Sequence, residues 1–92
     1  MNQISSSNND SAAQAKQQEF LERAKKGILE HLNNNGKRLD LVDLHDFSFK
    51  KFFIQHQGFS RLIESLVDQK LVDYDYATNS VVINQSGIQY IS

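Results

Sequence analysis

Residues 58–84, with the sequence GFSRLIESLVDQKLVDYDYATNSVVIN, decide the fold of this 92-residue chain. After Leu71 the apolar residues are spaced by two, and a β-branched run at 81–83 follows the turn-forming segment 77–80. Before Leu71, five apolar residues recur at the spacing of one helical face: Phe59, Leu62, Ile63, Leu66 and Val67. The stretch therefore predicts one helix followed by two strands that a short loop joins.

A long helix is expected upstream, from about residue 12 to residue 33. Its residues are strong helix formers, and the segment 33–36, NNNG, provides a helix end. The apolar residues at helical spacing are Phe20, Leu21, Ala24, Ile28 and Leu32. Residues 1–13 are polar and rich in Ser and Asn, which predicts a disordered tail. Residues 14–92 are then expected to form a single domain.

The segment between the two helices is predicted to contain a strand and a second helix. Leu39 and Leu41 alternate with charged residues, which is typical of a short edge strand within residues 37–44. A brief helix capped by Asp46 or Ser48 should follow, with a turn before Phe59. Phe59 and four phenylalanines of this segment are expected to provide the bulkiest core packing: Phe47, Phe49, Phe52 and Phe53.

The C-terminal residues predict a closing turn or helix. Asn84 is placed to cap it, and Ile88 and Ile91 have the spacing of one helical face. The predicted fold is therefore α+β, in the order α-β-α-α-β-β with a short C-terminal turn or helix.

This order and three segments resemble the winged helix-turn-helix superfamily of small bacterial and archaeal regulators. Residues 59–66 resemble the start of its recognition helix, residues 66–72 resemble the exit from that helix into the wing, and residues 84–91 resemble its usual C-terminal ending. The resemblance covers roughly residues 19–91. It implies a DNA-binding domain of a transcriptional regulator that forms a dimer through its long first helix.

The resemblance also implies which residues would contact DNA. Recognition helices offer polar side chains to base edges, while other basic residues contact phosphates. The residues expected at base edges are Gln57, Ser60, Arg61 and Gln69. The residues expected at phosphates, if they converge on one face rather than being scattered solvated bases, are Lys37, Arg38, Lys50 and Lys51.

The charge distribution supports an alternative function. The net charge is −1, and the part of the chain from Phe59 to Ser92 has two basic residues against four acidic ones. No basic residue occurs in the expected wing loop at 77–80, although phosphate contacts require positive charge. The alternative is a protein-interaction module without DNA binding, in which four acidic residues bind a basic or apolar partner: Glu64, Asp68, Asp73 and Asp75.

Residues for catalysis or metal binding are not recognisable. The three histidines match neither HxxxH nor HExxH spacing. Asp73 and Asp75 match the first two positions of a calcium loop, but its glycine and its final glutamate are missing. The three tyrosines, Tyr74, Tyr76 and Tyr90, are expected to pack on the core rather than stack on bases. We therefore expect no enzymatic activity, no metal and no cofactor.

The composition indicates a cytoplasmic protein. The chain contains no cysteine, no apolar run that could span a bilayer and no N-terminal pattern of a secretion signal. We therefore expect DNA, a protein partner or a second copy of the chain as binding partners, and no membrane.

Overall fold

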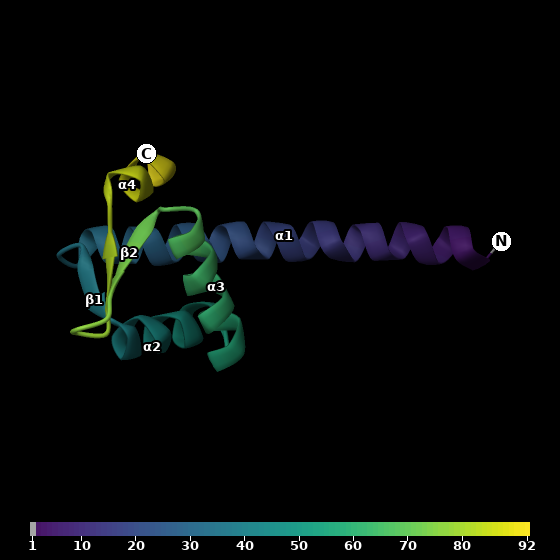
Figure 1. Ribbon diagram of the computed structural model, residues 1–92. Helices are drawn as coiled ribbons and strands as arrows, with labels where there is room; N and C mark the ends of the chain where they lie inside the picture. Colours follow the sequence, from purple (N-terminus) through teal and green to yellow (C-terminus); the bar gives the residue numbers. More distant parts are fainter. Residues whose placement is uncertain (1) are drawn as a thin grey trace.

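The structure is a computed structural model that describes the backbone of residues 2–92 and the side chains of residues 15–92. Its four helices and three strands follow the predicted order, and the closing segment is a helix (Figure 1). The α+β fold class is thereby confirmed. The elements are α1 (Asn2–Asn34), β1 (Arg38–Asp40), α2 (Leu41–Phe52), α3 (His56–Asp68), β2 (Val72–Asp75), β3 (Ser80–Ile83) and α4 (Gln85–Ile91).

The first helix is longer than the sequence predicts. α1 begins at Asn2, whereas we expected a disordered tail over residues 1–13. Neither glycine nor proline interrupts the chain before Gly27, so no residue forces a break in the helix there. In Figure 1 the N-terminal half of α1 extends away from all the other elements. The division into a tail and a domain beginning at residue 14 stays a prediction.

The second helix begins earlier than the sequence predicts. α2 starts at Leu41 with Asp40 as its N-cap residue, so neither Asp46 nor Ser48 caps it. The alternating pair of leucines was too short to distinguish a strand from the first turn of a helix. In the helix, Leu44 and Ser48 lie one turn apart and are buried, and the Ser48 hydroxyl donates to the Leu44 carbonyl over 2.9 Å. β1 is correspondingly short, although it is an edge strand as predicted.

The three strands form one antiparallel sheet in the order β1-β3-β2. Since alternate residues of a strand face opposite sides, the register separates the side chains into two faces. Leu39, Val81 and Tyr74 are aligned across the sheet, and Val81 lies fully buried in the core. Arg38 and Asp73 are aligned through Val82 on the opposite face.

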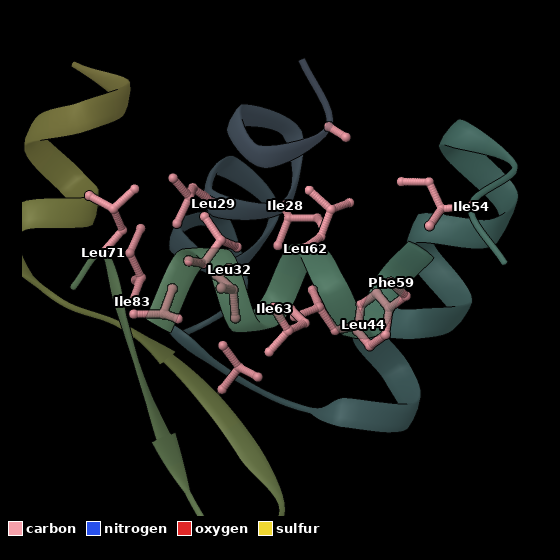
Figure 2. Packing of buried hydrophobic residues seen from close by; sticks show 14 residues of the cluster. Ile28, Leu29, Leu32, Leu44, Ile54, Phe59, Leu62, Ile63, Leu71 and Ile83 are labelled. Atoms are coloured by element: carbon pink, nitrogen blue, oxygen red, sulfur yellow. The ribbon is translucent and has the colours of Figure 1, made fainter. Parts of the chain in front are cut away.

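The core is mainly aliphatic, and the prediction that five phenylalanines provide its bulkiest packing is confirmed only in part. Phe59 is buried, whereas Phe49 and Phe53 are 49% and 80% exposed. Because α2 begins early and turns Leu44 inward, Phe49 points outward, and Phe53 lies after the end of the helix. Phe47 and Phe52 are half-buried and pack against the core, as expected. The buried cluster is drawn in Figure 2 and consists of Ala24, Ile28, Leu29, Leu32, Leu44, Ile54, Phe59, Leu62, Ile63, Leu66, Leu71, Val72, Val81 and Ile83.

The C-terminal helix is held by the cap that the sequence predicts. The Asn84 carboxamide oxygen accepts a hydrogen bond from the Gly87 backbone N–H over 3.0 Å, and its nitrogen donates to the Lys70 carbonyl over 2.9 Å. The Tyr90 hydroxyl donates to the Glu22 carboxylate, which joins α4 to α1. This hydrogen bond lowers the pKa of Glu22 and raises the pKa of Tyr90.

Candidate nucleic-acid interface

The helix α3 buries one face and leaves the opposite face open. Phe59, Leu62, Ile63 and Leu66 lie in the core, as the sequence predicts from their spacing. One flank of α3 borders a hollow shared with α1, and the other flank borders hollows shared with α2 and β2. The polar residues of α3 are therefore distributed over several sides of the helix.

The four residues expected at base edges do not share one side of α3. Arg61 and Gln69 line the hollow against α1, together with Lys25. Ser60 lines the hollow between α3, α2 and β2. Gln57 lies beside the turn between α2 and α3. Gln57 lies one helical turn before both Ser60 and Arg61, so its side chain can contact a ligand beside either of them.

The four residues expected at phosphates are also separated. Lys50 and Lys51 lie in the last turn of α2, where Lys50 pairs with Asp46 over 3.0 Å and Lys51 is exposed. Lys37 lies at the end of the sheet near α4, where its carbonyl accepts from the Ile83 backbone N–H. Arg38 lies on the outer face of the sheet.

Arg38 is held by the wing strand β2. Its guanidinium donates to the Asp75 carboxylate over 2.9 Å and to the Thr78 hydroxyl over 3.3 Å. The Asp75 carboxylate also accepts from the Ala77 backbone N–H, which stabilises the turn between β2 and β3. The bond from Arg38 lowers the pKa of Asp75 most, and the Thr78 hydroxyl lowers it further. The positive charge of Arg38 and the negative charge of Asp75 therefore partly neutralise each other at the wing, which consists of β2, β3 and the turn between them.

The four acidic residues of the alternative function lie on two surfaces. Glu64 and Asp68 line a hollow between α3 and β2. Asp73 and Asp75 alternate with Tyr74, and Tyr74 lines the same hollow, so these two aspartates project from the opposite face of the sheet. Only the pair on α3 can therefore act on a ligand bound between the helix and the wing.

Two adjoining hollows, which share Ile63 and Tyr74, form a groove between α3 and β2 that we name the wing groove. Their volumes are about 290 and 350 Å³. Sequence periodicity did not identify this site, because it depends on how α2 and β2 pack beside α3. The wing groove is lined by Leu41, Val42, His45, His56, Phe59, Ser60, Ile63, Glu64, Val67, Asp68, Tyr74 and Tyr76.

Two residues of the wing groove depart from ordinary packing. Tyr76 is 88% exposed, so the prediction that this tyrosine packs on the core is wrong. Its ring lies 4.7 Å from the ring of the half-buried Tyr74. The ring of His45 lies 4.9 Å from Phe59, and its Nε2 atom is buried without a hydrogen-bond partner in the described part of the chain.

The described residues provide neither a metal site nor a membrane span. Within this part of the chain, no group of three or more histidine, cysteine or acidic residues could hold a metal ion. None of the helices there has the length and apolar character needed to cross a bilayer.

The fold can be compared with known proteins. No protein-family model and no curated protein matches the chain. Among solved structures, the chain is similar to F93 from STIV, a winged-helix DNA-binding protein, with a TM-score of 0.57 and 26% sequence identity. The similarity covers 70% of this chain and 74% of F93. Together with the observed element order, this likeness shows that the chain has a winged helix-turn-helix fold.

Proposed function

We propose that this protein is a small cytoplasmic transcriptional regulator that binds DNA with α3 as its recognition helix. The observation that carries this proposal is the likeness to F93, a winged-helix DNA-binding protein, over 70% of the chain. The open face of α3 supports the proposal, because a recognition helix must present uncovered polar side chains to the major groove.

The proposed contact surface is centred on the turn between α2 and α3. Lys50 and Lys51 end α2, and Gln57 lies in the first turn of α3, so all three flank the same short turn at residues 53–55. Arg61 follows Gln57 by one helical turn. We assign Gln57 and Arg61 to base edges and the two lysines to phosphates. Ser60 and Gln69 line hollows on two other sides of α3, so we propose them only as polar contacts at the margin of this surface. Lys37 and Arg38 lie at other places in the fold.

Replacing Arg61, Lys50 and Lys51 by alanine together should weaken binding to a random-sequence duplex about tenfold or more at about 50 mM salt. The loss of three positive charges should also reduce the dependence of affinity on salt between about 50 and 200 mM. Fluorescence anisotropy with a labelled duplex measures both quantities.

The matched control for this experiment replaces Arg23, Lys26 and Lys70 by alanine. It removes the same charges from exposed positions outside the proposed surface. Equal losses in the two triple variants would mean that only the overall charge matters. If the wild-type protein fails to bind the duplex at the lower salt concentration, DNA binding is contradicted.

We infer that the protein forms a dimer through the exposed part of α1. Phe20 and Leu21 were expected on the core face of this helix, yet they are 40% and 38% exposed. Phe20 borders one hollow together with the strongly exposed Phe53, and Leu21 borders another. Adjacent exposed apolar side chains of this kind are typical of association surfaces.

Leu21→Lys should weaken the dimer about tenfold or more, because it places an unpaired charge in an apolar contact. Size-exclusion chromatography with light scattering over a concentration series measures the dissociation. Asn34→Lys adds the same charge at the exposed far end of α1 and should leave the dimer unchanged. A monomeric wild-type protein at high concentration would contradict the proposal.

A further inference from the structure

We propose that the wing groove binds a basic amphipathic segment of a partner protein. Such a segment would place apolar side chains between α3 and the wing, with Lys or Arg beside Glu64 and Asp68. The inference goes beyond DNA binding and does not depend on it, because the contact involves different chemistry and can be measured without DNA.

The apolar character of the groove indicates an apolar contact. Val42 on α2 and Tyr76 just after the wing strand are 73% and 88% exposed, and each lines a different one of the two hollows. Ile63, Val67 and Tyr74 also line the groove. Binding is favoured when a partner removes exposed apolar side chains of adjoining hollows from water.

The acidic residues of the groove favour a positively charged partner. Glu64 and Asp68 lie one turn apart on α3 and are both exposed. Neither carboxylate forms a salt bridge within the described residues, and neither Lys nor Arg occurs in the lining. A phosphate backbone in this groove would be repelled by the two carboxylates, whereas lysine or arginine side chains would complement them.

The length of the groove fits a helical segment. The residues of α3 that line it run from His56 to Asp68, a helix of 13 residues. At about 1.5 Å per residue, this surface is roughly 20 Å long. A partner helix of about three to four turns would cover it and could place two or three apolar anchors in the groove.

The test uses a synthetic peptide of about 14 residues with leucines at i, i+3, i+4 and i+7 and lysines elsewhere. Its binding is measured by fluorescence anisotropy without DNA. We expect saturable binding, and we expect Glu64→Lys combined with Asp68→Lys to weaken it about tenfold or more. Tyr76→Ser should also weaken it, because the proposed contact is apolar as well as charged.

Asp73→Lys, compared with Glu64→Lys alone, is the matched control, because each variant reverses one exposed carboxylate but Asp73 faces the opposite side of the sheet. It should change peptide binding by less than about twofold. An equal loss from Asp73→Lys, no effect of Tyr76→Ser, or equal binding of a peptide with glutamates in place of the lysines would each overturn the proposal. Circular dichroism of every variant separates these outcomes from unfolding. A duplex that binds the protein while the peptide does not would also overturn it and leave the DNA proposal standing.

Discussion

Gly87→Ala should destabilise the protein by about 2 kcal/mol, even though alanine favours helices over glycine by about 1 kcal/mol. Gly87 is buried in α4, where an added Cβ would lie 2.2 Å from the Leu71 carbonyl oxygen and 2.7 Å from the Ile83 side chain. The first of these contacts is with backbone, which cannot rotate away. Since α4 begins directly after β3, the clash must displace the helix from the sheet.

Thermal unfolding followed by circular dichroism checks this prediction, with an expected decrease in Tm of about 8 to 16 °C. Ser86→Ala changes the preceding exposed residue of the same helix and should alter stability by less than about 0.5 kcal/mol. Gly58→Ala is a second control, because there the added Cβ meets only the Ile54 side chain at 3.3 Å. If Gly87→Ala unfolds at the same temperature as Ser86→Ala, then α4 does not rest on the Leu71 carbonyl.

The contrast between Gly87 and Asn84 shows how far local sequence patterns can predict this fold. Asn84 was identified as a helix cap, because capping depends on residues within one turn of each other. The close approach of Gly87 to Leu71 depends on where the chain places an element 16 positions earlier. No local pattern carries that information.

The difference between local patterns and tertiary packing also explains why the buried face of α3 was predicted correctly and that of α2 was not. In α3, apolar residues mark one face over the whole length of the helix, and all the expected core residues from Phe59 to Leu66 are buried. In α2, the phenylalanines are bulkier than Leu44 and Ser48 and were expected to fill the core, but Phe47 and Phe52 are only half-buried and Phe49 is exposed. Packing against α1 and α3 instead selects the small serine for the interior.

The candidate site could be predicted only in part for a related reason. The sequence identified α3 and its polar residues, but which neighbour covers each flank depends on tertiary packing. The acidic residues illustrate this point, since Asp73 and Glu64 were expected to act on one partner. The strand register places Asp73 on the far side of the sheet, while Glu64 remains beside the wing groove.

Leu44→Ala should cost about 3 to 4 kcal/mol, the largest loss of stability that we expect from a single truncation in this protein. Leu44 is fully buried and belongs to the cluster that includes Phe59 and Ile63 (Figure 2). The other buried residue of α2 is Ser48, whose hydroxyl donates a hydrogen bond to the Leu44 carbonyl. Serine contributes little apolar area to the core. A cavity at Leu44 therefore removes the main apolar anchor of the helix.

Urea unfolding measures the loss of stability caused by Leu44→Ala, and hydrogen exchange shows which helix is loosened. A domain of this size is typically stabilised by about 5 to 14 kcal/mol, so the variant should still fold while the amides of α2 lose protection before those of α3. Val42→Ala shortens a 73% exposed residue of the same helix and should change stability by less than about 0.5 kcal/mol. If the two variants are equally stable, α2 is held by contacts other than Leu44. If α2 loosens as expected, the turn that presents Lys50, Lys51 and Gln57 loosens with it, so DNA affinity should fall before the domain unfolds.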